Sequence, residues 1–169
     1  MRAFLDGLDA AELLLPPDRR CLAALAPKML ALSAERSLGA IPYFVPVEHT
    51  SVARAQLGAG PLLAPELAYV LDTDAGRART TAREYARLYL RMSNYTNNLL
   101  ALGSTSEDLA GDGSDRLVDA VIPHGTAARI AAVVRAHLDA GADHVAVQAL
   151  GEPGIPRKGW SALAEALLG

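Results

Sequence analysis

The chain has 169 residues, of which 51% are hydrophobic and 21% charged, and its net charge is −3. This balance predicts one globular domain with a sizeable core, while the weak negative charge and the 5% aromatic content argue against a nucleic-acid-binding surface. Cys21 is the single cysteine, which excludes an intramolecular disulfide and a multi-cysteine metal site and favours a reducing, cytoplasmic location.

The N-terminal residues predict an amphipathic helix that ends at Pro16-Pro17. Asp6, Asp9 and Glu12 interrupt this stretch, so it lacks the apolar core of a signal peptide. No apolar run in the sequence approaches the roughly 20 residues of a membrane-spanning helix. We therefore expect no membrane partner.

Residues 21–49 predict a strand–helix–strand unit that contains an anion-binding turn. The apolar run Cys21–Leu25 comes first, and Pro27 follows at a first helical position, where its missing N–H has no cost. Gly39 is expected to end the helix, and Ile41–Val45 is the second apolar run. A strand that leads into a helix N-terminus leaves backbone N–H groups free, which favours a phosphate or a carboxylate there.

Four nearly continuous apolar runs predict parallel strands that are buried on both faces. These runs are Arg20–Leu25, Ala40–Val45, Glu66–Asp72 and Asp143–Leu150. The helical patterns between and after them are Pro27–Ser37, Glu48–Leu57, Asp74–Leu102 with a break near Ser93-Asn94, Ser106–Val121, Ala127–Ala140 and Lys158–Leu168. Thr126 is the expected N-cap of the Ala127–Ala140 helix, and Gly141 is its expected C′ residue.

The alternation of strands and helices predicts an α/β fold with parallel strands and crossover helices. We expect a single domain over residues 1–169, with residues 74–121 as a helical insertion before the last strand. Four such units form an open sheet or half of an eight-stranded barrel. A complete barrel takes about 250 residues, which is more than this chain has.

Five segments in this order resemble the luciferase-like monooxygenase superfamily, and in particular its coenzyme F420-dependent oxidoreductases. They are AALAPKMLALSAERSLGAIPYFVPVEHT, GPLLAPELAYVLDTD, LRMSNYTNNLLALG, GSDRLVDAVIPHG and AAVVRAHLDAGADHVAVQ. The resemblance extends from about Arg20 to the end and implies the C-terminal part of a TIM-like (βα)8 barrel. It also implies binding of a deazaflavin (F420), or alternatively FMN, at the C-terminal ends of the strands.

By this resemblance the chain is an oxidoreductase domain that transfers a hydride between the cofactor and a small organic substrate. A flavin monooxygenase that uses oxygen is a variant within the same class. The side chains that handle protons in the superfamily usually lie in the half that is missing here, so the catalytic residues stay unassigned and the activity of the truncated chain is open. The alternative is a non-catalytic half-barrel that acts as a binding or self-assembly module. Its open strand edges would favour a homo-oligomer.

The predicted cofactor wall consists of the turn after the first strand and the end of the second strand. It comprises Ala24, Leu25, Ala26, Pro27, Lys28, Tyr43 and Phe44. Relatives often have glycine where Ala26 stands, and glycine allows a closer approach of the backbone to a ligand. Lys28 either pairs with a phosphate or is solvated, and Tyr43 either flanks the ring or packs in the core.

Three further patterns allow two interpretations each. Glu48 and His49 form either an acid–base pair or an ordinary first helical turn, which we favour, and the spacing does not support zinc. Asn94–Asn98 either lines a substrate or breaks a helix, and the sequence leaves this open. A stripe of arginines either meets the charged coenzyme tail or is a solvated helix face, which we favour. It consists of Arg79, Arg83, Arg87 and Arg91.

Overall fold

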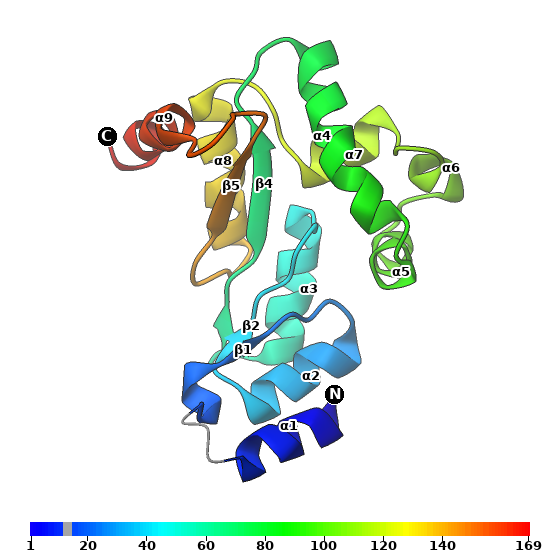
Figure 1. The fold of residues 1–169 in the computed structure, drawn as a ribbon, viewed down its shortest axis with the longest axis vertical. Helices are drawn as coiled ribbons and strands as arrows, with labels where there is room; N and C mark the ends of the chain where they lie inside the picture. The colour runs from blue at the N-terminus through cyan, green and yellow to red at the C-terminus, as the bar shows by residue number, and fades with distance from the viewer. Residues whose placement is uncertain (12–14) are drawn as a thin grey trace.

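The computed structural model describes residues 1–11 and 15–169 (Figure 1). Its first helix, α1 (Arg2–Ala10), is shorter than the predicted helix, because Ala11 already has an extended backbone. The chain then reverses, so that the Arg20 guanidinium pairs with Asp9 on α1 at 2.6 Å. A short 3-10 turn, η1 (Pro17–Arg19), precedes Arg20. Residues 12–14 of the predicted helix lie outside the described residues.

Parallel strands form the centre of the fold, as the sequence predicts. β1 (Cys21–Leu22), β2 (Gly39–Ala40) and β3 (Leu62–Leu63) pair in that order, and β4 (Glu66–Val70) pairs with β5 (Ala146–Leu150). Only Ala64 and Pro65 separate β3 from β4. The Glu66 N–H still donates to the Pro42 carbonyl on the β2 side, at 2.9 Å, while the Pro65 carbonyl accepts from the Ala146 N–H at 3.0 Å. The two sheets are therefore one continuous run of neighbouring parallel strands.

The regular strands are shorter than the apolar runs that predict them. The expected strand Ala40–Val45 is regular only over Gly39–Ala40, because Pro42 has no N–H and Phe44 adopts a positive φ of 54°. Burial on both faces holds for β4, whose five residues are all buried. It fails for β5, because four of its residues are only partly buried and Gln148 in its middle is exposed.

Four helices follow the strands and pack against them or against one another. They are α2 (Pro27–Arg36), α3 (Val47–Leu57), α8 (Ala127–Asp139) and α9 (Arg157–Leu168). The predicted caps of α8 are present: the Thr126 hydroxyl accepts from the Arg129 N–H at 3.3 Å, and Gly141 has a φ of 103°. On one face of β4, Tyr69 packs with Ile130 of α8 and Leu163 of α9.

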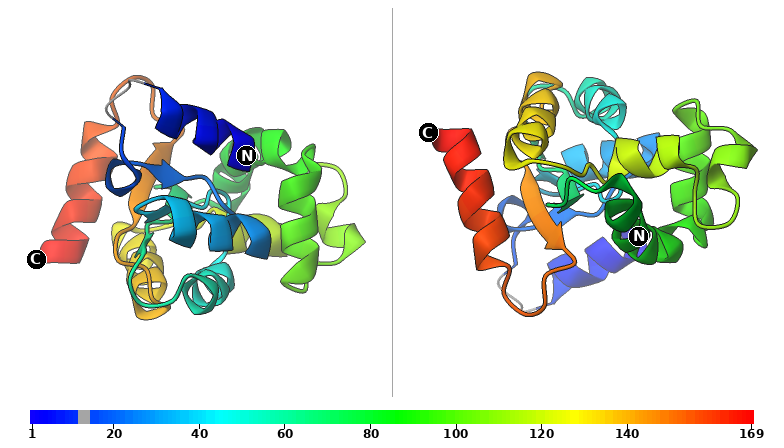
Figure 2. Two further views of the ribbon diagram at one scale, coloured as in Figure 1. Left: turned by 90° about the horizontal axis from the view of Figure 1, so that it is seen from below. Right: turned by 90° about the horizontal axis from the view of Figure 1, so that it is seen from above.

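The segment between β4 and β5 consists of helices α4 (Ala75–Leu90), α5 (Ser93–Ala101), α6 (Ser106–Leu109) and α7 (Asp115–Val121). Along α4, the fully buried residues Ala78, Ala82 and Ala86 belong to the same core cluster as Ala68 and Val70 of β4. The small side chains allow the helix to lie close to the strand. Helices α4 and α9 consequently lie on opposite sides of β4 and β5 (Figure 2).

Three of the four arginines of the stripe pair with aspartates, while Arg91, like Arg87, is exposed, as a solvated helix face predicts. Arg79 binds Asp119 through two bonds of 2.9 and 2.6 Å, and Arg87 binds Asp112 at 2.9 and 2.8 Å. Arg83 pairs with Asp115. These arginines therefore fasten α4 to α7 and to the loop before it, and they are not a free basic surface for a coenzyme tail.

Candidate functional site

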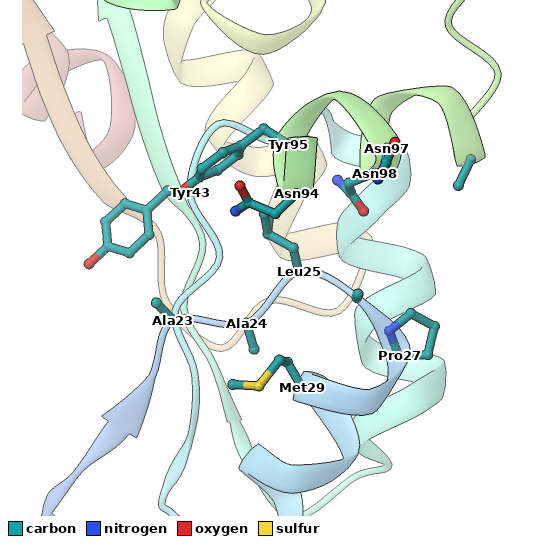
Figure 3. Close-up of a pocket in the computed structure, with 12 residues that line it drawn as sticks. Ala23, Ala24, Leu25, Pro27, Met29, Tyr43, Asn94, Tyr95, Asn97 and Asn98 are labelled. Carbon is teal, nitrogen blue, oxygen red and sulfur yellow. The ribbon is translucent and has the colours of Figure 1, made fainter. Parts of the chain in front are cut away.

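A cavity of about 350 Å³ lies between the β1–α2 turn and helix α5 (Figure 3). Its wall combines backbone and apolar side chains of the turn with Tyr43, which follows β2, and with polar side chains of α5. The lining residues are Ala23, Ala24, Leu25, Ala26, Pro27, Met29, Tyr43, Asn94, Tyr95, Asn97, Asn98 and Ala101. The cavity therefore lies at the C-terminal ends of the parallel strands β1 and β2, which is where α/β folds usually bind ligands.

The structure brings most of the predicted cofactor wall to this cavity. Ala24, Leu25, Ala26, Pro27 and Tyr43 line it. Lys28, on the first turn of α2, does not line it and is exposed to solvent. Phe44 does not line it either, and its side chain is buried in the core.

Helix α2 begins at the turn as the sequence indicates. Ala26 is the N-cap residue with an extended backbone, and Pro27 occupies the first helical position. The Leu25 carbonyl just before it accepts a hydrogen bond from Nε2 of His49 at 3.0 Å. His49 lies on α3, and only 1% of its surface is exposed, so burial lowers the pKa of its ring. A neutral histidine on α3 thus fixes the position of the turn through its backbone. The sequence analysis considered His49 only as the partner of Glu48 and did not predict this role.

An aromatic cluster of Phe44, Tyr89 and Tyr95 adjoins the cavity, and Tyr95 on α5 belongs to both. Phe44 stacks on Tyr89 with ring centroids 4.6 Å apart and an interplanar angle of 6°. The Tyr95 ring meets the Tyr89 ring edge-on at 4.7 Å, and its side chain extends from α5 toward Tyr43 (Figure 3). Phe44, whose backbone has a positive φ, contacts both Tyr89 and Tyr95, so the unusual backbone conformation occurs at the centre of this aromatic cluster.

A buried carboxyl group, Glu66, adjoins this cluster, and the sequence analysis did not single it out. Glu66 is 7% exposed, and its carboxyl oxygens make no hydrogen bond of ordinary geometry to the described residues. Burial raises its pKa to about 7, although the Phe44 N–H and the Tyr85 hydroxyl near it act in the opposite direction. The Tyr85 hydroxyl lies 2.9 Å from the Tyr89 hydroxyl and donates to Gln148 Oε1 at 3.3 Å. The sequence signal that could have identified Glu66 as a candidate functional residue is its position as the first residue of an otherwise apolar strand.

The other histidines do not join the cavity. His137 is buried on α8, with Nδ1 2.8 Å from the Thr50 hydroxyl, and burial lowers its pKa to about 4. His124 lies 3.3 Å from Asp119, and His144 is exposed. Within residues 1–11 and 15–169, no group of three or more His, Cys, Asp or Glu side chains is arranged to hold a metal ion, and no helix is long and apolar enough to cross a membrane.

No family model matches the chain, and no curated protein matches it. Solved structures do match. An F420-dependent secondary alcohol dehydrogenase in complex with an F420-acetone adduct aligns with a TM-score of 0.60 and 12% identity over 87% of this chain and 48% of that protein. Apo-MsnO8 aligns with a TM-score of 0.59 and 15% identity over 98% of this chain and 60% of that protein. The chain therefore shares the α/β fold of these two proteins, and it spans about half of the first and about three-fifths of the second.

The side chains of the cavity fit the ring of a deazaflavin or flavin, and the N-terminus of α2, which also lines it and has no side-chain cap, offers backbone N–H groups to an anion. Its volume is near the lower end of the range for small-molecule sites, which run from about 300 to 1,000 Å³. None of its lining side chains carries a charge. The aromatic ring of Tyr95 and the amides of α5 offer stacking and hydrogen bonds, which are the contacts that a neutral heterocycle uses.

Proposed function

We propose that the chain is the deazaflavin (F420)- or flavin-binding oxidoreductase domain of a luciferase-like protein, and that it corresponds to the C-terminal half of a TIM-like barrel. The observation that carries this proposal is the cavity at the C-terminal ends of β1 and β2, in a fold shared with an F420-dependent alcohol dehydrogenase. When bound in reduced form, such a cofactor supplies a hydride to a small organic substrate.

In this proposal each part of the site has a distinct physical role. The turn Ala24–Pro27 presents apolar surface to the ring, and His49 keeps that turn in place through the Leu25 carbonyl. Tyr43 and Tyr95 supply aromatic surface. Glu66 holds a proton on its carboxyl group near neutral pH, behind the aromatic cluster.

Titration with oxidised F420, and separately with FMN, tests the proposal through the change in cofactor fluorescence. We expect saturable binding of one of the two with a dissociation constant of about 10 μM or tighter. Ala101→Phe fills the cavity from an exposed position of α5 and should abolish binding. Leu88→Phe, at a residue of α4 that is 64% exposed and outside the lining, is the matched control. The proposal would be refuted if the wild-type chain bound neither F420 nor FMN.

A second candidate is a self-assembly module, and the position of β1 and β5 favours it. Both are terminal strands in the described sheet order, so each has one edge without a strand neighbour. Unpaired edges of parallel strands readily add another strand. Sedimentation over a wide range of concentrations should then show a dimer or a larger species, and a monomer at every concentration would exclude this candidate.

A further inference from the structure

Helices α4 to α7 form a unit whose ionic contacts are mostly internal. Toward the strands, and apart from residues 122–125 where the chain returns to β4, the described part of this unit makes one side-chain hydrogen bond, from the Tyr85 hydroxyl to Gln148 Oε1 at 3.3 Å. The rest of that contact is apolar and centres on the small residues of α4. Three arginine–aspartate pairs join α4 to α7 and to the loop before it: Arg79–Asp119, Arg83–Asp115 and Arg87–Asp112.

Empty space flanks the contact between this helical unit and the strands on two sides. The first space is the 350 Å³ cavity, of which α5 forms one wall (Figure 3). The second is a cavity of about 140 Å³ that Glu48 of α3 lines together with Leu99 of α5 and Val121 of α7. A helix with cavities on two sides has fewer packing contacts to hold it, so α5 is the part of the unit that can separate from the strands at least cost.

Glu66 lies inside this contact. It shares the face of β4 that bears Ala68 and Val70, which pack against α4. Its two carboxyl oxygens are buried and make no hydrogen bond of ordinary geometry to the described residues. The groups that surround the carboxyl are all neutral, and no described cation pairs with it. They are the Phe44 N–H, the hydroxyls of Tyr85 and Tyr89 on α4, Tyr95 on α5 and the Gln148 amide on β5.

A negative charge on Glu66 would therefore have to be met by water. The opposite face of β4 is covered by α8 and α9, so water reaches Glu66 where α4 and α5 lie on the strands. Burial raises the pKa of Glu66 from its ordinary 4.5 to about 7. This difference means that ionisation disfavours the closed arrangement, relative to one with a solvated carboxylate, by up to about 300-fold.

We propose that Glu66 is a positioning residue for the cavity: its neutral carboxyl group allows α4 and α5 to pack on the strands, and its ionisation releases them and opens the α5 wall. The inference rests on the proposed function for the identity of the ligand and deepens it, because it makes binding depend on a proton that no ligand atom touches. The opening itself can be measured without any ligand.

Amide hydrogen exchange of the wild type and Glu66→Gln, compared at the same pH, measures the opening. Glutamine cannot ionise, so the ratio of wild-type to variant exchange rates in α5 should grow about 70-fold between pH 5 and pH 8. The amides of α8, on the other face of β4, should show a much smaller change in this ratio. Glu84→Gln removes the same charge at an exposed position of α4 and is the matched control, which should exchange like the wild type at both pH values.

The wild type alone provides a second measurement that does not depend on how well a variant folds. Its exchange rates in α5, divided by those in α8, should rise between pH 5 and pH 8, because the chemical dependence of exchange on pH is common to both helices. Fluorescence titrations with F420 and with FMN at the same pH values add the effect on binding. The affinity of the wild type should fall with pH relative to that of Glu66→Gln.

The outcomes separate this inference from the proposed function. Faster exchange at pH 8 that is confined to α4 and α5 and depends on Glu66, without binding of F420 or FMN, supports the inference and refutes the proposed function. Binding of either cofactor together with an unchanged exchange ratio, or with an acceleration that α8 shares equally, overturns the inference and leaves the function standing. The absence of both the binding and the local acceleration overturns both.

Discussion

The replacement Glu66→Gln should stabilise the protein at and above neutral pH and leave its stability at pH 5 nearly unchanged. The rise in the pKa of Glu66 from its ordinary 4.5 to about 7 corresponds to about 3 kcal/mol, at about 1.4 kcal/mol per pH unit. The folded state holds the proton more tightly than the unfolded chain. The favourable contribution is therefore complete below pH 4.5 and is lost as the pH rises through about 7.

Glutamine has nearly the shape of the protonated carboxyl group and cannot ionise, so the variant should lack this loss. Urea unfolding of both proteins at pH 5, 6, 7 and 8 measures the difference, which should grow to about 3 kcal/mol at pH 8. Glu84→Gln, at an exposed position of α4, is the matched control and should follow the wild-type curve. Parallel curves for the wild type and Glu66→Gln would show that the carboxyl group is solvated or paired, and would refute the reasoning.

Three further changes test other parts of the structure. His49→Leu removes the donor to the Leu25 carbonyl and should lower the free energy of unfolding by about 1 kcal/mol, as measured in urea. It should also weaken F420 binding more than His49→Gln does. Equal F420 affinities of the two variants would contradict the positioning role of His49. His137, whose pKa is lowered to about 4, should cause a loss of stability as the pH falls from 6.5 toward 4, because the unfolded chain takes up the proton first, and His137→Gln should reduce this loss. Gly39→Ala places a Cβ in collision with the Leu62 carbonyl oxygen and should destabilise the fold by about 3 kcal/mol. Thermal unfolding would disprove this value if the variant melted like the wild type.

The sequence predicts the order of elements well because each element has a local signal. Apolar runs mark the strands, helical spacing marks α2 and α8, and Thr126 and Gly141 mark the ends of α8. The break between α4 and α5 falls at Arg91 and Met92, directly before Ser93-Asn94, so the predicted break near these residues is confirmed, and the polar run itself lies within α5. Three of its asparagines also line the cavity, so the two interpretations do not exclude each other.

What the sequence does not predict depends on contacts between distant residues. Gly39 is not the residue that ends α2; it lies in β2, where the Leu62 backbone passes too close for a side chain. His49 bonds a carbonyl 24 positions earlier in the chain, and Arg79 pairs with an aspartate 40 positions later. No periodicity in a single sequence encodes such pairs.

The arrangement of α4 changes what self-association would require. An open half-barrel should expose an apolar inner face, which either a second copy or helices of the same chain would have to cover. Here the small residues of α4 already cover that face at β4, and Gln148 makes the same face of β5 polar. A partner would thus gain little from burying a face, and the free edges of β1 and β5 would have to supply the contact through backbone hydrogen bonds. Because β1 is regular over only two residues, β5 is the stronger edge, and a proline at Ala149 should disrupt an assembly built on it while leaving the cavity, on the other strands, intact.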